Sequence, residues 1–182
     1  MLIQNTRRYQ LFKKIIALIT SFFIVEQVAS ASETNEDRIL LNTSKGEIVI
    51  KLLPEIAPTH VTRIVELVKS GFYDGIIFHR IIPGFMAQTG DPKGNGTGGS
   101  GTNLKAEFSD YEYIYGTVGM ARTMDPNSAD SQFFICFDGC GHLTGQYTAW
   151  GQVETGMEVV ETLNVGEPPS DPDKIVSAKI IN

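Results

Sequence analysis

Ile48, Ile50 and Leu52 recur at every second position of the segment EIVIKL, residues 47–52. A period of two is typical of a strand with one buried face. The preceding run RILLNT is separated from this segment by the turn Ser44-Lys45-Gly46, and Pro54 follows it. We therefore expect two strands around this turn, and we expect the second strand to end at the proline.

The next segment, APTHVTRIVELVKSG, changes to a helical period. Its apolar positions fall at i, i+3, i+4 and i+7, and they are Val61, Ile64, Val65 and Val68. This spacing predicts one buried face of a helix. Pro58 suits the first turn of that helix, and Gly71 suits its C-terminal stop.

Short apolar segments between glycine-rich turns make up most of the remaining chain. They predict strands at 76–80, 85–88, 117–121, 132–137, 149–153 and 175–181, and a short helix near 157–163. Eight strands with only two helices favour a mainly β fold, a closed β-barrel capped by helices. The segment GEPPSDPDK, residues 166–174, is expected to be a rigid surface loop.

The first 31 residues have the pattern of a secretory signal peptide. A basic leader precedes the apolar run 15–25 and the small-residue site Ala29-Ser30-Ala31, which predicts cleavage after Ala31. The apolar run is shorter than the ~20 residues of a membrane span. An uncleaved anchor is the alternative, and both the general secretory and the twin-arginine routes fit. We expect residues 32–37 to form a flexible tail, and no stable membrane insertion after cleavage.

Removal of the leader leaves 151 residues, which suits one domain over 38–182. The whole chain has a net charge of −6, and since the leader contributes +3, the remainder carries −9. A chain this acidic with no cluster of Lys or Arg is not expected to bind nucleic acid. No long apolar surface helix indicates assembly, so we expect a monomer.

Cys136 and Cys140 have C-x-x-x-C spacing. An oxidising compartment would allow a disulfide. However, the loop would be tight and Cys136 reads as a buried strand residue, so we expect free thiols. His142 is near both cysteines, but no second pair of ligands follows, and we expect no metal.

Two motifs that suggest other functions are weak. The stretch GNGTGGSG, residues 94–101, contains G-x-G-x-x-G but precedes a polar segment rather than a helix, so we interpret it as a loop that lets backbone approach a ligand, and expect no cofactor. His79, Asp91 and Ser131 could be named as a hydrolase triad, but sequence order gives no geometry and no nucleophile-elbow sequence is present.

The run FHRIIPGFMAQTGD, residues 78–91, places Arg80 among apolar residues. A buried charge is costly unless it is paired, so Arg80 is either a surface charge or a functional group beside an apolar patch. Three separated segments supply further apolar and amide residues. If their strands are neighbours, they form a shallow apolar pocket with one cation and two amides, which suits an apolar ring attached to a peptide.

The segments FHRIIPGFMAQTGD, GNGTGG, GMAR and SQFFIC together resemble the cyclophilins, which are peptidyl-prolyl cis-trans isomerases. The resemblance covers about residues 38–181, extends to exported bacterial members, and implies an eight-stranded antiparallel barrel with a helix at each end. It places the catalytic arginine at Arg80. It places substrate-binding residues at Phe85, Met86, Gln88, Gly96, Ala121, Arg122, Thr123, Gln132, Phe134, Leu143 and Tyr147.

Three positions depart from the best-known pattern of the family. Arg122 stands where many eukaryotic members have Asn, His142 replaces a tryptophan linked to cyclosporin binding, and Tyr147 replaces a pocket histidine. The departures at His142 and Tyr147 weigh against tight cyclosporin binding and leave isomerase activity as the expectation.

The resemblance implies rotation of X-Pro bonds, without a cofactor, in proline-containing unfolded or exported polypeptides. With the leader, it predicts a periplasmic protein, or one secreted further, that assists the folding of exported proteins. The alternative is a proline-peptide-binding chaperone module whose isomerase activity is incidental.

Overall fold

Strands that turn every second side chain inward build the interior of the domain. Ile48, Ile50 and Leu52 are all buried, as the alternation predicts. The computed structural model describes residues 37–182, so the predicted signal peptide and residues 32–36 of the predicted tail lie outside the described residues. Within this part, no helix has the length and hydropathy needed to cross a bilayer.

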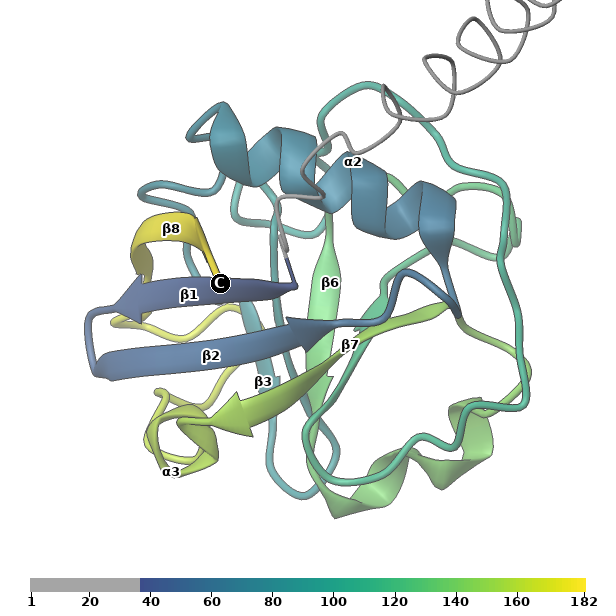
Figure 1. Ribbon diagram of the computed structural model, residues 1–182. Helices are drawn as coiled ribbons and strands as arrows, with labels where there is room; N and C mark the ends of the chain where they lie inside the picture. The colour runs from purple at the N-terminus through teal and green to yellow at the C-terminus, as the bar shows by residue number, and fades with distance from the viewer. Residues whose placement is uncertain (1–36) are drawn as a thin grey trace, which may run out of the picture. The chain divides into compact units, whose positions relative to one another are not determined.

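Within residues 37–182, eight strands, two α-helices and a 3-10 helix make up the fold (Figure 1). The strands are β1 (Arg38–Thr43), β2 (Gly46–Leu52), β3 (Arg80–Ile82), β4 (Met86–Thr89), β5 (Thr117–Met120), β6 (Phe133–Cys136), β7 (Ala149–Thr155) and β8 (Ile175–Ile181). The helices are α2 (Pro58–Lys69), the 3-10 helix η1 (Asp138–Leu143) and α3 (Met157–Val160). The predicted helix at 157–163 is shorter than expected, and η1 was not predicted.

The strands pair in the order β3-β4-β6-β5-β7-β2-β1-β8, and every ladder is antiparallel. The sheet curls so that β1, β2 and β7 form one wall, and α2 lies across one end of it (Figure 1). The mainly β class and the eight antiparallel strands are therefore confirmed.

The prediction of a closed barrel is wrong, because among residues 37–182 no ladder joins β3 to β8. We call the gap between β3 and β8 the seam. The contacts across it are isolated bridges, Ile77 to Lys174 and Ile81 to Gly166. The segment that faces β3 contains Pro168, Pro169 and Pro172, which have no N–H group to donate, so a regular ladder cannot continue there. The fold is an open, curled half-barrel.

The same seam explains why the predicted strand at 76–80 is wrong. Phe78 donates its N–H to the carbonyl of Asp173 at 2.8 Å, and the carbonyl of Ile77 accepts the Thr89 hydroxyl at 2.9 Å. These contacts satisfy the backbone outside a ladder, so β3 begins only at Arg80.

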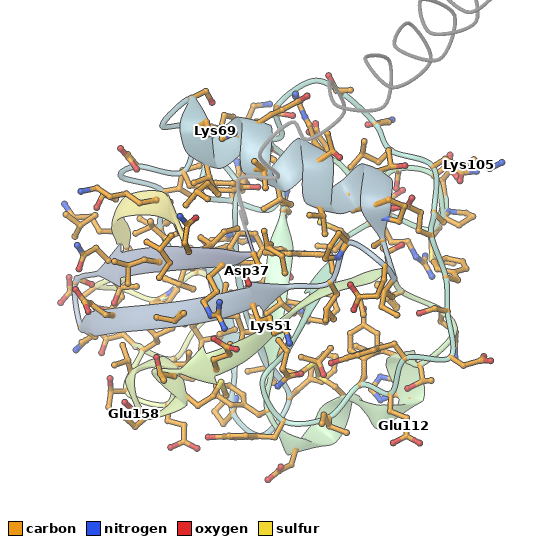
Figure 2. All side chains as sticks on the ribbon, in the orientation of Figure 1. Asp37, Lys51, Lys69, Lys105, Glu112 and Glu158 are labelled. Carbon is orange, nitrogen blue, oxygen red and sulfur yellow. A yellow bond between two sulfur atoms is a disulfide. The ribbon has the colours of Figure 1, made fainter. Side chains whose placement is uncertain are left out.

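One apolar core lies between the sheet and α2, and α2 packs against β8. The buried residues of α2 are His60, Val61, Ile64, Leu67 and Val68. Leu67 therefore joins the inner face, and the predicted Val65 is half-buried and packs against the same core. Gly71 has a φ of +71° and follows the helix end, as expected for a stop. Side chains fill the space between sheet and helix, while charged groups such as Lys105, Glu112 and Glu158 extend from the rim (Figure 2).

Candidate functional site

Alternate residues of β3, β4 and β6 serve two different apolar clusters. Ala87 and Ile135 face the main core, whereas Met86, Phe134 and Cys136 belong to a second, smaller cluster on the other face of the sheet. The register aligns Arg80 with Gln88, and Gln88 with Phe134, across three neighbouring strands. The antiparallel pairing thus brings three separated segments into one row.

A cavity of about 240 Å³ opens over this row. We call it the apolar cavity, and its lining residues are Arg80, Phe85, Met86, Gln88, Ala121, Arg122, Phe134, Leu143 and Tyr147. A second cavity, of about 560 Å³, runs along the glycine-rich loop; we call it the loop cavity. The loop cavity contains Gly96, Thr123 and Gln132 and shares Gln88, Ala121 and Arg122 with the first. The structure therefore brings all twelve predicted site residues together.

Aromatic rings shape the walls of the apolar cavity. Phe134 stacks on Tyr113 with ring centroids 6.0 Å apart, and it meets Tyr147 edge to face at 5.8 Å. Phe85 stacks on His142 at 5.5 Å. Such contacts hold the rings in fixed orientations, so the cavity is preformed.

The prediction of free thiols is wrong, because Cys136 and Cys140 form a disulfide. Their Cα atoms are 5.9 Å apart, within the usual range for a disulfide. The 3-10 helix η1, which the sequence did not predict, turns the chain back so that a five-residue loop can close. The disulfide joins the strand that carries Phe134 to the helix that carries Leu143, and Cys140 Sγ lies 3.1 Å from the carbonyl oxygen of Phe85. The disulfide therefore fixes Phe134 and Leu143, which both line the apolar cavity, relative to each other.

Arg80 lies at the edge of the apolar cavity, where its side chain is 36% exposed. Its Nε donates to Oε2 of Glu167 at 2.7 Å, and Nη1 lies 3.8 Å from the sulfur of Met86. Among the described residues no oxygen accepts from Nη1 or Nη2. One edge of the guanidinium is thus held by a carboxylate, and its terminal N–H groups remain for a ligand.

The two predicted amides form a chain that ends in the glycine-rich loop. Gln88 Nε2 donates to Gln132 Oε1 at 2.9 Å, and Gln132 Nε2 donates to the carbonyls of Gly96 and Gly98 at 3.1 and 2.8 Å. Within residues 37–182 no donor reaches Gln88 Oε1, so this oxygen can accept the N–H of a bound peptide.

The glycine-rich loop folds around a carboxylate of the chain itself. Asp91 is fully buried and accepts the N–H groups of Lys93, Asn95 and Gly96 at 2.7, 3.0 and 2.6 Å. Burial acts to raise the pKa of Asp91, but the backbone N–H groups outweigh it and hold this pKa below its usual value. Because these donors face Asp91, they do not form a phosphate cradle.

The hydrolase triad is not assembled. Ser131 donates its hydroxyl to the carbonyl of Gly90 at 2.8 Å, and Asp91 accepts the loop N–H groups. Both ring nitrogens of His79 are buried and have no hydrogen-bond partner among residues 37–182, and burial lowers the pKa of His79. Among these three residues, no nucleophile therefore faces a base.

Sequence reasoning missed Glu167 and Tyr113 as parts of the site. Glu167 lies 87 positions from Arg80, within a proline-rich loop that gives no periodic signal. Tyr113 lies in an irregular segment, although its partner Phe134 was predicted. In residues 37–182, His, Cys, Asp and Glu side chains do not gather in groups of three that could hold a metal ion.

Comparisons with known proteins agree on one family. The family model for cyclophilin type peptidyl-prolyl cis-trans isomerases matches residues 38–180. A protein of Brucella suis named probable peptidyl-prolyl cis-trans isomerase is 47% identical over 171 residues, which cover 85% of this chain and 87% of the relative. A cyclophilin crystal structure from Hirschia baltica superposes with a TM-score of 0.73 at 31% identity, covering 80% of this chain and 74% of that one. A Cryptosporidium parvum cyclophilin type isomerase, crystallised in the presence of the dipeptide Ala-Pro, gives 0.75 at 29% identity, covering 80% and 99%.

Proposed function

The chain belongs to the cyclophilin type peptidyl-prolyl cis-trans isomerase family, and from this membership we propose that Arg80 and the apolar cavity carry its isomerase activity on X-Pro bonds. The observation that supports this proposal is the row of Arg80, Gln88 and Phe134 beside a cavity of about 240 Å³. This row places a cation, an amide and an aromatic ring side by side.

The cation stabilises the twisted state through which the X-Pro bond rotates. Rotation about an X-Pro bond breaks amide resonance and has a barrier of ~18–20 kcal/mol. In the twisted state the prolyl nitrogen is pyramidal and basic, so a guanidinium donor near that nitrogen or near the proline carbonyl stabilises it more than the planar amide. Arg80 supplies a planar guanidinium donor, and Glu167 holds one edge of it.

The apolar wall and the amides hold the peptide while the bond rotates. Phe85, Met86, Phe134 and Leu143 would enclose the pyrrolidine ring. Gln88 Oε1 is free to accept a peptide N–H. The Ala-Pro dipeptide used with the Cryptosporidium protein supports proline as the group that enters this cavity.

Comparison of the parent with Arg80→Ala tests the role of Arg80. Exchange NMR on a short Ala-Pro peptide should show catalysed isomerisation by the parent and a loss of about 10²-fold in the variant, ~2.7 kcal/mol of transition-state stabilisation. Arg38→Ala is the matched control, because Arg38 lies on β1, pairs with Glu154 of β7 and lines neither cavity, so the rate of this variant should stay at the parent value. An unchanged rate in Arg80→Ala would refute the assignment.

The alternative, a proline-peptide-binding chaperone module with incidental catalysis, makes a different prediction. A parent that binds the peptide, shown by chemical-shift changes, but barely accelerates exchange would favour this module. The terminal N–H groups of Arg80, which meet no oxygen acceptor among residues 37–182, favour the enzyme, because binding alone does not need a cation beside an apolar wall.

We also propose that the protein works in the periplasm as a monomer and isomerises unfolded or exported polypeptides. Two observations support export: the leader pattern of residues 1–31 and the Cys136–Cys140 disulfide, which needs an oxidising compartment. Cell fractionation of the full chain, beside a variant that lacks residues 2–31, tests the location. Retention of the full chain in the cytoplasm would overturn it, and sedimentation velocity would test the monomer.

A further inference from the structure

A second arginine stands where the two cavities meet. Arg122 follows β5 after Ala121, whose N–H donates to the carbonyl of Gln132 at 2.9 Å, and it lines both the apolar cavity and the loop cavity. A peptide with its proline in the apolar cavity and its neighbouring residues along the loop cavity would pass this side chain.

The guanidinium of Arg122 is held in place by neutral groups. Nε and Nη2 donate to the carbonyl of Gln146 at 3.3 and 3.0 Å, and Nη1 donates to the carbonyl of Thr123 at 2.9 Å. The group lies over the ring of Tyr147, 4.3 Å from its centroid. Gln146 is itself fixed, because its Nε2 donates to the carbonyl of His142 at 2.9 Å. Arg122 is therefore oriented before a ligand arrives, which lowers the entropy cost of binding.

The charge of Arg122 has no carboxylate partner within the described residues. The other three arginines there each have one: Arg38 pairs with Glu154, Arg63 with Glu66, and Arg80 with Glu167. Although the domain is acidic overall, the half-buried Arg122 at the junction of the two cavities is therefore not neutralised by a carboxylate of residues 37–182.

The hydrogen bonds of Arg122 also leave a defined binding capacity. A guanidinium has five N–H groups, and Arg122 uses one on each of its three nitrogens. One N–H on Nη1 and one on Nη2 therefore have no acceptor among residues 37–182. Two such groups suit a carboxylate, which accepts both at once. Asp130 also lines the loop cavity, where its carboxylate accepts hydrogen bonds from the Ser100 hydroxyl and the Gly101 N–H. The negative charge of Asp130 disfavours a second acid deeper in that cavity.

We propose that Arg122 makes this isomerase select polypeptides with an acidic side chain, Asp or Glu, within two residues of the proline. The inference rests on the proposed function, because it assumes that the proline occupies the apolar cavity. The acidic side chain binds at the junction of the cavities and leaves Arg80 free for the twisted bond.

Peptides that differ only by charge test this selection. Exchange NMR gives kcat/KM for four peptides in which Glu or its uncharged isostere Gln stands directly before Ala-Pro, or directly after Pro. We expect kcat/KM of the Glu peptide to exceed kcat/KM of the matching Gln peptide about three- to ten-fold at one of the two positions. This is the size expected for a partly exposed charged pair. The ratio should approach one at high salt.

Arg122→Gln should abolish the Glu-to-Gln ratio, whatever its overall rate. Lys179→Gln is the matched control, because it removes one positive charge from an exposed position of β8 that lines neither cavity, and it should keep the ratio. Equal kcat/KM for Glu and Gln peptides in the parent, or a ratio that survives Arg122→Gln, would overturn the proposal while isomerisation stands. Failure of the parent to isomerise any peptide would instead refute the proposed function.

Discussion

Replacing Asp91 by Asn should destabilise the domain through the glycine-rich loop. The buried carboxylate accepts three N–H groups at 2.6–3.0 Å, from Lys93, Asn95 and Gly96. Asparagine has one side-chain oxygen and turns its NH2 toward one of these donors, so a charged hydrogen bond is lost and a buried N–H remains unsatisfied. Such losses cost about 1–3 kcal/mol each, so we expect the free energy of unfolding to fall by about 2–4 kcal/mol.

Urea unfolding measures this effect, with the fluorescence of Trp150 as the probe, because Trp150 is the sole tryptophan and is buried. Asp110→Asn is the matched control, because Asp110 is exposed, and its unfolding midpoint should stay near that of the parent. The substitution at Asp91 should also raise KM more than it lowers kcat, since the loop carbonyls hold Gln132.

The pH dependence supplies an independent check. The pKa of Asp91 is lowered in the folded chain, so its contribution is complete above the unfolded pKa of about 3.9 and is lost as the pH falls below that value. The stability difference between parent and Asp91→Asn should therefore shrink in acid. Equal unfolding midpoints for the two proteins at pH 7 would refute the view that Asp91 organises the loop.

Two further predictions concern the disulfide and His79. Reduction of Cys136–Cys140 with dithiothreitol should lower the free energy of unfolding by about 2 kcal/mol, the value for a five-residue loop, and the Cys136→Ala/Cys140→Ala protein should not respond to the reductant. Because burial lowers the pKa of His79, protons favour the unfolded chain, so stability should be complete above pH ~6.5 and fall below it. Urea titrations at pH 7.5 and 5.5 test this, and a decline as large in His79→Gln as in the parent would exclude His79 as its source.

Local patterns predicted most of the fold. The alternation of Ile48, Ile50 and Leu52 and the helical spacing of Val61, Ile64 and Val68 each report one buried face, which needs no knowledge of the partner. The twelve site residues also came together, although their grouping depended on resemblance to a family and not on spacing alone.

Barrel closure and the Arg80–Glu167 pair were mispredicted or missed because distant segments meet there, whereas the disulfide joins residues only four positions apart. Closure of the barrel depends on whether residues 166–174 can pair with β3, and the prolines of that loop prevent it. The disulfide depends on η1, whose glycine-rich sequence indicates a turn rather than a helix. The Arg80–Glu167 pair depends on where that same proline-rich loop lies, which periodicity does not encode.

The alternation of β4 and β6 has a consequence for how such a site can change. Ala87 and Ile135 belong to the interior core, while their neighbours Met86 and Phe134 line the apolar cavity. Each of these short strands thus has two sets of side chains with separate roles. One set packs the core, and the other set shapes the cavity. The cavity-facing set can vary in shape and charge while the interior set stays constant, so new binding preferences can arise on an unaltered scaffold.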